Sequence, residues 1–306
     1  MSSTYALAAE PALEPYQQTS IPKPEPDASL LPAPPYLFRQ RPLSITLHGP
    51  AIFASCLALA LLIHMGGSRP SEVLVMLMPW ALLVRNDYQN FINLGPGGTP
   101  STLRGYLRIS WLRLWAIRDP FAAPKSRHLL PVSGILPAAV GSQRSHQALP
   151  YRPGPRPHVV GIAPQRQLDQ HGSRPCYLAL RRAMQALADR RPLAFGTERS
   201  CVEKHGLALF ARHPLHTSCQ GEICHVHDSD HSLHMCLHPD DIAEVLRKGW
   251  GQRHPLARKR WFPQMPVSPD FVMIYAPRNQ QELEVTYRVI EAAIWYTLAE
   301  RVDLDA

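Results

Sequence analysis

A histidine-rich segment in the last third of the chain is the part of the sequence best suited to chemistry. It reads EICHVHDSDHSLHM and contains His225, His227 and His234. Residues two apart on a β-strand point to the same side of the sheet, so His225 and His227 are expected to share a face. The residues from Asp228 to His231 have the composition of a turn, which would return the chain and set His234 across from the pair.

Three interpretations of this cluster are open on the residues alone. His225, His227 and His234 could bind Zn or Fe(II), because clustered imidazoles suit these ions. Alternatively, one histidine, oriented by Asp228 or Asp230, could act as a general base without a metal. The third interpretation assigns them no chemistry, since the chain has 15 histidines and some must lie on strand surfaces.

A second candidate group follows downstream, in the segment GWGQRHPL. Arg253 and His254 are adjacent there, just after a helix predicted from Asp240 to Lys248 with Gly249 as its stop. That helix begins next to the predicted hairpin. Arg253 and His254 can therefore converge on the same pocket as the three histidines.

Hydrophobic patterns predict the elements that position these residues. Two further helices are predicted at Cys176–Arg190 and Asn279–Glu300, the second with Asn279 and Glu282 as a capping box. The predicted strands are Leu207–Arg212, Ile223–His227, Leu233–Leu237 and Phe271–Tyr275. Together they predict an α+β fold over residues 165–306, with a small, mainly antiparallel sheet and flanking helices.

The first part of the chain differs in composition. Residues 1–42 are rich in Pro, Ala, Ser and Glu without apolar periodicity, so we predict a disordered tail. Apolar runs follow at about 50–65 and 73–84. Each is slightly short for a membrane span, yet the first is apolar on every face, and we predict a membrane anchor over residues 43–84, as one span or a helical hairpin. A pair of buried core helices is the alternative.

Residues 85–164 are predicted to hold a basic juxtamembrane helix and a loop. In the helix, about 99–115, Leu103, Leu107, Trp111 and Leu114 form a stripe flanked by arginines. Such a helix either lies on anionic lipid or packs on the main domain. Arginines flank both sides of the apolar runs, so the positive-inside rule places the C-terminal domain in the cytosol.

The cysteines and the charge limit the classes of partner and compartment. The six cysteines form no CxxC pair, and we predict free thiols in a reducing compartment. The formal charge is +8, but no clustered basic run with interleaved aromatic residues indicates a nucleic-acid site. A membrane surface is the better explanation of the charge, and the Pro-rich tail could dock SH3- or WW-type partners.

Several motifs resemble those of the fungal luciferase family. They are HVHDSDHSLHMCL, LRKGWGQRHPLA and FVMIYAPRNQQELE, with VRNDYQNFINLGPGGTPSTLRGYL, PYRPGPRP, PQRQLDQ and VEKHGLALF upstream. The resemblance covers about Arg85 to Ala299. It departs from the family in the spacing between HxHD and the next histidine, and at Arg258, where a glycine often stands.

The resemblance implies a membrane-associated fungal oxygenase of the luciferase type. Luminescent members oxidise a 3-hydroxylated styrylpyrone (3-hydroxyhispidin) with O2 through an endoperoxide that loses CO2. No organic cofactor is implied, and a metal at His225, His227 and His234 is possible but not favoured. The resemblance does not decide whether light is emitted.

This chemistry needs a base, cationic groups that hold an enolate, and a dry pocket. We assign the catalytic roles to the two histidine clusters and the substrate contacts to residues in the neighbouring motifs. The catalytic candidates are His225, His227, Asp228, His234, Arg253 and His254. The substrate-binding candidates are Glu203, His205, Trp250, Tyr275 and Arg278, although core packing competes as the role of Trp250 and Tyr275.

Two other functions remain in competition with the oxygenase. One is a tailoring enzyme of secondary metabolism that uses the same pocket without oxygen. The other is a non-catalytic, membrane-bound binding module. The expected ligand in each case is a small aromatic or polyketide-derived molecule, with membrane lipid as the second partner.

Overall fold

The computed structural model describes residues 47–65, 70–125, 148–216, 219–259 and 264–304, and the statements below concern these residues. The tail predicted to be disordered, residues 1–42, lies outside them. The fold is α+β, as predicted, with a mainly antiparallel sheet and flanking helices.

The main sheet has six antiparallel strands in the order β3-β4-β5-β6-β8-β7. Their bounds are β3 Phe195–Arg199, β4 Leu207–Ala211, β5 Glu222–Val226, β6 Leu233–Cys236, β7 Gly251–Arg253 and β8 Phe271–Ile274. The four predicted strands are confirmed to within a residue at each end. The strands β3 and β7 were not predicted, because the first is polar at its exposed end and the second is only three residues long.

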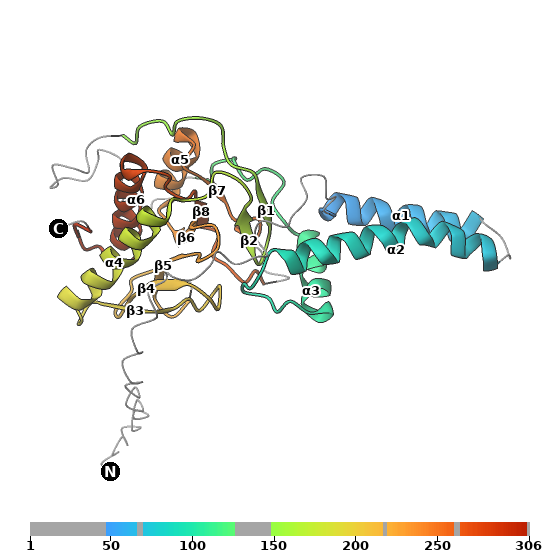
Figure 1. Cartoon of the computed structure of the whole chain (residues 1–306), viewed down its shortest axis with the longest axis horizontal. Helices are drawn as coiled ribbons and strands as arrows, with labels where there is room; N and C mark the ends of the chain where they lie inside the picture. Colours follow the sequence, from blue (N-terminus) through green and yellow to red (C-terminus); the bar gives the residue numbers. More distant parts are fainter. Residues whose placement is uncertain (1–46, 66–69, 126–147, 217–218, 260–263, 305–306) are drawn as a thin grey trace, which may run out of the picture. The chain divides into compact units, whose positions relative to one another are not determined.

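Helices cover one face of this sheet (Figure 1). The helix α4 (Arg174–Arg190) packs on β3 and β4, and α6 (Gln280–Leu298) packs on β4, β5 and β6 and against α4. Leu180 and Met184 of α4 and Ile290 of α6 are fully buried there, with Val226 from the sheet. This apolar layer forms the main core and holds the strands in place from the helix-covered face of the sheet.

The predicted helix signals act as expected. The side chain of Asn279 accepts a hydrogen bond from the Glu282 backbone N–H at the start of α6. The helix α5 (Pro239–Lys248) has acidic residues in its first turn, and it ends at Gly249 in the left-handed conformation, with φ of 80°. The start and end of α5, which joins β6 to β7, are thereby fixed. The GWGQRHP motif therefore begins at Gly249, where the helix ends.

The opposite face of the sheet carries the histidines. On β5 and β6, Val226 and Leu233 belong to the helix-covered core, whereas His225 and His234 are direct cross-strand partners that point the other way. A two-stranded hairpin, β1 (Val159–Gly161) and β2 (Gln165–Gln167), lies over this face and contacts it through β2. All three side chains of β2 are buried, although all are polar.

Three helices precede the sheet: α1 (Gly49–Met65), α2 (Pro70–Asn93) and α3 (Leu103–Arg113). A buried ion pair between Asp87 and Arg113 links α2 to α3. Asp87 also accepts from the Leu47 N–H at 2.9 Å and from the Tyr106 hydroxyl at 2.8 Å. Phe91, Tyr106, Ile109 and Leu112 form a small apolar cluster around this network, which also includes Ile162 and Leu256.

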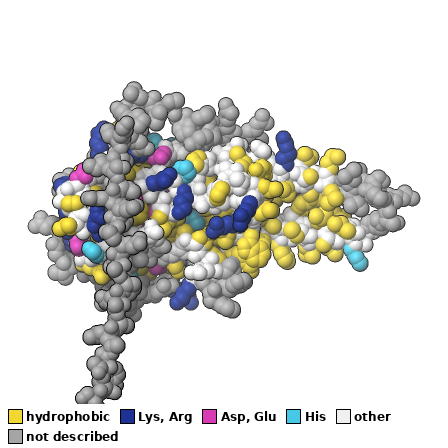
Figure 2. Space-filling model, turned by 90° about the horizontal axis from the view of Figure 1, so that it is seen from below, with side chains coloured by type: hydrophobic (Ala, Val, Ile, Leu, Met, Phe, Trp, Pro, Cys, Tyr) yellow, Lys and Arg dark blue, Asp and Glu magenta, His cyan; other side chains and the backbone are white. Residues whose placement is uncertain are grey.

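The prediction of a membrane-spanning segment is not supported. Among the described helices, none is long and apolar enough to cross a membrane. The apolar runs do form helices, but α1 has 17 residues, and α2 continues through the charged residues Arg85 and Asp87. Many of their apolar side chains are exposed all the same, and Figure 2 shows hydrophobic side chains gathered over these helices.

The basic helix predicted near 99–115 is present as α3, and it has two apolar faces. Tyr106, Ile109 and Leu112 are buried in the cluster described above. The predicted stripe of Leu103, Leu107, Trp111 and Leu114 is exposed. The helix therefore packs on the rest of the chain with one side and presents the stripe to the surroundings with the other.

Candidate active site

Three imidazoles converge on one point of the uncovered sheet face. His234 Nδ1 lies 3.0 Å from His227 Nε2 and 3.3 Å from His225 Nε2. The three nitrogen atoms lie within 4.8 Å of one another, and each side chain is at most 2 % exposed. The hairpin predicted from the sequence thus brings His225, His227 and His234 together.

The other nitrogen of each ring is held by an oxygen atom. His225 Nδ1 lies 2.5 Å from a carboxylate oxygen of Glu222, and His227 Nδ1 lies 3.2 Å from Asp230 and 2.8 Å from the Ser232 hydroxyl oxygen. His234 Nε2 lies 2.9 Å from the amide oxygen of Gln165 on β2. Of these four partner side chains, sequence analysis placed only Asp230 in the site; Glu222, Ser232 and Gln165 were missed.

The protonation of the cluster follows from its burial. Burial lowers the pKa of His234 well below its ordinary value, and the neighbouring imidazoles of His227 and His225 lower it further. Burial also lowers the pKa of His227, against its hydrogen bond to Asp230. For Asp230 itself, burial raises the pKa, but the contacts with His227 and Arg166 outweigh it and the net shift is downward.

Neutral imidazoles beside an ionised carboxylate donate from the nitrogen that faces it. His227 then carries its proton on Nδ1, and its Nε2 lone pair points into the centre of the cluster. The same assignment places protons on His225 Nδ1, toward Glu222, and on His234 Nε2, toward the amide oxygen of Gln165. Three lone pairs then face one another.

A β-bulge brings Glu222 to the same face as His225. Along β4 and β5, Leu209 pairs with Cys224, but the next residue of β4, Phe210, pairs with Glu222, so Ile223 is the extra residue. Without the bulge, residues three apart on a strand would point to opposite faces. Glu222 is buried, and burial raises the pKa of its carboxyl, but the contacts with His225, Ser200 and Cys201 lower it overall.

A buried ion pair lies beside the cluster. Arg166 on β2 bonds Glu203, which follows β3, and both side chains are almost fully buried. Burial raises the pKa of Glu203, but Arg166 and the nearby His227 and His225 outweigh that effect, so the net shift is downward. The chain passes so close to this carboxylate at Gly97 that a Cβ there would lie 2.9 Å from Glu203 Oε1.

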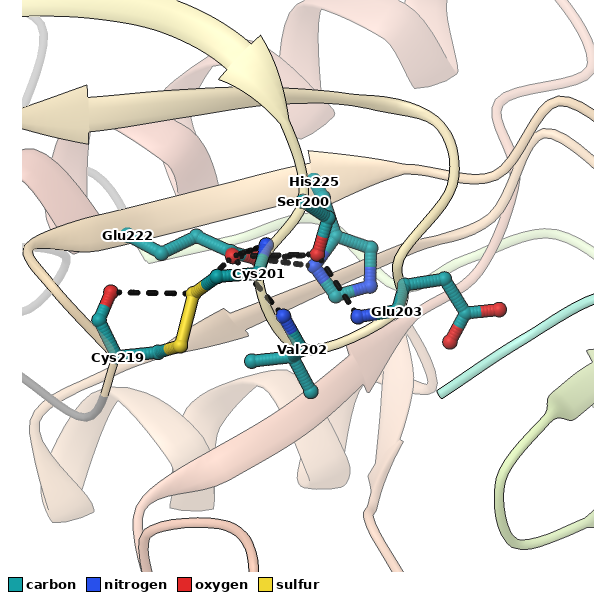
Figure 3. The surroundings of a disulfide bond; sticks show 7 residues. All are labelled: Ser200, Cys201, Val202, Glu203, Cys219, Glu222 and His225. Carbon is teal, nitrogen blue, oxygen red and sulfur yellow. Dashed lines mark hydrogen bonds and ion pairs between the residues drawn. A yellow bond between two sulfur atoms is a disulfide. The ribbon is translucent and has the colours of Figure 1, made fainter. Parts of the chain in front are cut away.

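A disulfide joins Cys201 to Cys219 next to these residues, so the prediction that all six cysteines are free is wrong for this pair. The other four cysteines, Cys56, Cys176, Cys224 and Cys236, are free thiols. Figure 3 shows that the linked segment surrounds the Glu222 carboxylate, which accepts from the Ser200 hydroxyl and the Cys201 N–H. The two cysteines lie 18 residues apart, a spacing that carries no motif in the sequence.

His254 borders the cluster but uses both of its ring nitrogens elsewhere. Its ring stands edge-on to His234, with ring centroids 5.5 Å apart. Nε2 donates to the Ile162 carbonyl at 2.8 Å, and Nδ1 accepts from the Leu256 N–H. Burial lowers the pKa of His254 to about 4. Phe271 stacks on His234 from the same side and shields the cluster from water.

The structure does not bring the remaining downstream candidates to the three imidazoles. Trp250 donates to the Pro150 carbonyl, and the Tyr275 hydroxyl donates to Gln252. Arg278 binds Glu282 and Gln170 in a separate group. Arg253 donates to the Ala257 carbonyl next along the chain. Trp250 and Tyr275 are both part of the buried core.

Two other candidates lie near the surface. Asp228 sits in the turn between β5 and β6, where it accepts from the Tyr177 hydroxyl at 2.6 Å and binds Arg181. It therefore does not orient His225 or His227, a task that falls to Glu222 and Asp230. His205 is exposed in the turn between β3 and β4.

Comparisons with known proteins identify the family of the region that holds this site. The family model described as "Luciferase domain" matches residues 220–293, which include β5, β6 and all three imidazoles. The chain is 34 % identical to a luciferase of Armillaria mellea over 240 residues, which cover 70 % of this chain and 81 % of that protein. A luciferase of Neonothopanus nambi is 32 % identical over 237 residues, with the same coverage. No solved structure matches the chain.

The chain belongs to the fungal luciferase family. The resemblance inferred from the sequence motifs is thereby confirmed. The matched domain of this luciferase-like protein holds the imidazoles and the residues Glu222, Asp230 and Ser232, whereas Gln165, Arg166 and Glu203 lie outside it, upstream. The site is therefore completed by residues that only the fold brings to the domain.

Two pockets lie near the cluster, although none of the three imidazoles lines either of them. One, of about 370 Å³, is lined by Glu222, Cys236, Asp270 and Tyr296, among others. The other, of about 200 Å³, is mostly apolar and is lined by Phe91, Ile162 and Pro255, among others. The first pocket is linked to the cluster through Glu222, which contacts His225, and the second through Ile162, whose carbonyl contacts His254.

Proposed function

We propose that this luciferase-like chain catalyses the reaction of O2 with an enolisable aromatic or polyketide-derived pyrone of the 3-hydroxyhispidin type. The observation that carries the proposal is the convergence of His225, His227 and His234 inside the matched luciferase domain. In this proposal no organic cofactor takes part, and O2 is the co-substrate.

The cluster supports such chemistry because it gathers several proton acceptors in one buried place. The reaction begins when the enol loses a proton, and a site of convergent nitrogen lone pairs favours that loss. The enolate carbon then forms a bond to O2, and the resulting endoperoxide releases CO2. Burial of all three imidazoles excludes water that would otherwise quench the peroxide.

The charges around the cluster further support a reaction that passes through an anion. Arg166 is the buried cation next to the imidazoles, and its charge acts on both His227 and His234. We assign to Arg166 the role of the cation that stabilises the enolate. The mostly apolar pocket at Ile162 is suited to the aromatic part of the substrate.

The test is turnover of the full chain with 3-hydroxyhispidin, followed as O2 uptake, CO2 release and light. We expect His227→Ala and His234→Ala each to reduce turnover by about 10²- to 10⁴-fold. The matched control is His231→Asn, in the same hairpin, because His231 packs on Tyr177 outside the cluster and Asn tolerates its positive φ of 64°.

Each outcome separates the competing functions. Consumption of O2 without light supports the oxygenase and removes luminescence from the proposal. Conversion of the pyrone without O2 would instead favour a tailoring enzyme. If the protein converts no pyrone, the non-catalytic binding module is the remaining hypothesis. If the wild type is active and the two alanine variants keep its rate, the site assignment is wrong.

A further inference from the structure

The arrangement of the three imidazoles poses an electrostatic problem that one proton does not solve. With protons on the outward nitrogens, the lone pairs of His225 Nε2, His227 Nε2 and His234 Nδ1 meet in one buried place. A single proton can bridge two of these nitrogens but leaves the third without a partner. An unpaired buried acceptor of this kind destabilises a fold.

The distances in the cluster match those of ligands that share one ion. Two imidazole nitrogens bound to a tetrahedral Zn²⁺ at about 2.0–2.1 Å lie about 3.3 Å apart. The two nitrogen–nitrogen distances recorded for His234 are 3.0 and 3.3 Å. Two of the three pairs therefore already have the spacing of ligands that share a cation, and all three nitrogen atoms lie within 4.8 Å of one another.

The outward contacts are those that support metal ligands. Histidines that bind metals donate their second ring N–H to a carboxylate, a carbonyl or an amide oxygen, which fixes the tautomer and the ring orientation. Here Glu222 holds His225, Asp230 and Ser232 hold His227, and Gln165 holds His234. Each ring has its own acceptor, and each acceptor comes from a different position in the chain.

The local charge also calls for a cation. Three buried carboxylates lie around the imidazoles, namely those of Glu203, Glu222 and Asp230. The guanidinium of Arg166 forms an ion pair with one of these carboxylates, that of Glu203. The carboxylates outnumber the guanidinium among these groups, and a bound cation would offset the difference. Buried charges are tolerated in proteins when they are compensated in this way.

We propose that His225, His227 and His234 form a binding site for one divalent transition-metal ion, with Glu222, Asp230 and Gln165 orienting the ligands. Three neutral imidazoles suit Zn, Fe(II) or Co(II) rather than Mg or Ca, which prefer oxygen. This replaces the metal-free interpretation that sequence analysis favoured. Three protein ligands leave a coordination position open, as in catalytic rather than structural sites.

An ion in this position would also take part in the proposed reaction, and this step rests on the proposed function. With the ion bound, the imidazoles would hold it and would no longer act as the base; the ion would supply Lewis acidity that lets the substrate bind as its enolate, with the enol proton released to solvent. The metal site itself stands without the proposed reaction, because metal binding can be measured in the absence of any substrate.

The rival arrangement involves Gln165. Its amide nitrogen is buried and has no hydrogen-bond partner in the described part of the chain. If the amide were turned over, that nitrogen would donate to His234 Nε2, and the proton of His234 would move to Nδ1. That proton would bridge to one neighbouring imidazole, so only one acceptor of the cluster would stay unpaired without a cation. This arrangement predicts a protein that binds no metal.

The experiment measures metal content of the full chain, expressed without a histidine tag and purified without chelator. We expect about one transition-metal ion per chain by elemental analysis. After removal of the ion with dipicolinate, titration with Co²⁺ should produce visible absorption bands that saturate at about one Co²⁺ per chain. Zn²⁺ should then displace the Co²⁺ and abolish the bands.

Variants locate the site. His234→Ala should lose the stoichiometric ion and the Co²⁺ bands, whereas His231→Asn, in the same hairpin but outside the cluster, should keep both. Because His234→Ala could fail to fold, Asp230→Asn provides a graded second test: it keeps a hydrogen-bond acceptor near His227 and should weaken Co²⁺ binding by about 10- to 100-fold. Circular dichroism of each variant reports whether it is folded.

Two results would overturn the proposal. One is a wild-type protein that is folded, holds no stoichiometric metal and shows no saturable Co²⁺ bands; this would support the turned-over Gln165 amide. The other is metal binding that is unchanged in folded His234→Ala and Asp230→Asn, which would place the ion elsewhere. An inactive protein that binds one ion in this cluster would contradict the proposed function but not the metal site.

Discussion

The histidine face of the sheet and the helices that precede it distribute polar and apolar groups in opposite ways. At the sheet face, imidazoles, carboxylates and an arginine are buried, and an oxygen holds the outward nitrogen of each of His225, His227 and His234. On α1 and α3, large apolar side chains such as Phe53, Leu107 and Trp111 are exposed.

Each arrangement departs from the usual rule that apolar groups are inside and polar groups outside. Burial of many polar groups costs stability unless each one is paired, so such groups point to chemistry at the sheet face. An exposed apolar surface is costly in water, so it points to contact with another apolar phase. The two regions therefore indicate different functions: reaction in one, and attachment in the other.

The Asp87–Arg113 ion pair is a buried polar contact within the helical region, and it links α2 to α3. Its removal tests how far this region depends on one polar contact. Asp87→Asn leaves the Arg113 guanidinium buried without its counter-ion, and we expect a loss of about 3–5 kcal/mol in the stability of the α1–α3 segment. Hydrogen exchange of the α3 amides and urea unfolding would measure it.

The control for Asp87→Asn removes both charges. In the double variant Asp87→Asn with Arg113→Met, no charge remains buried, so part of the lost stability should return. If the single variant unfolds like the wild type, the pair is not the anchor of this region, and its burial carries no energetic weight.

The disulfide offers a second comparison, since it lies beside the polar site and not in the helical region. Removing a cross-link that closes a loop of 18 residues should cost about 3 kcal/mol, mainly because the unfolded chain regains freedom. We expect Cys201→Ser and Cys219→Ser to lower the unfolding temperature by similar amounts.

Cys236→Ser is the matched control for the disulfide, because Cys236 lies in the same half of the chain and is not part of a disulfide. It should change the unfolding temperature much less. Thiol labelling of the unreduced, denatured protein should find four reactive cysteines, and labelling of Cys201 would contradict the link. The disulfide also removes free thiols as an argument for a reducing compartment.

The sequence was informative where one local signal decides the structure. The alternation of apolar and polar residues and the DSDH turn predict the hairpin of His225, His227 and His234, and the Asn279 cap predicts the start of α6. These features depend on neighbours within a few residues, whose geometry follows from the period of a strand or a helix.

The missed parts of the site depend on contacts between distant residues. Arg166 and Glu203 lie 37 positions apart and meet only because the β1–β2 hairpin covers the sheet face. Glu222 reaches His225 through a bulge, which changes the side of the strand on which a residue lies. The membrane-spanning interpretation lacks support for a different reason: apolar composition does not give the length of a helix, and among the described helices none is long and apolar enough to span a membrane.

The exposed stripe on α3 gives the last and smallest prediction, and we propose that it rests on an anionic lipid surface. Leu103, Leu107 and Trp111 are exposed on one side of α3, and the exposed arginines Arg104 and Arg108 flank them. Apolar side chains that enter the lipid interface, next to cations that meet its phosphates, explain both features together.

Leu107→Ser is the test of that surface. Full burial of a leucine side chain contributes about 1.5–3 kcal/mol, so the variant should bind vesicles of mixed phosphatidylcholine and phosphatidylserine at least about 10-fold more weakly in cosedimentation. The control is Leu193→Ser, because Leu193 is still more exposed, at 86 %, but lies in the turn after α4, away from α3. Its binding should equal that of the wild type, and raising the salt concentration should weaken binding of all three proteins because it screens the arginines.

If the wild type does not sediment with these vesicles, or if the two serine variants lose binding equally, the stripe on α3 is not a lipid-binding surface, and the contrast between the two regions must have another cause.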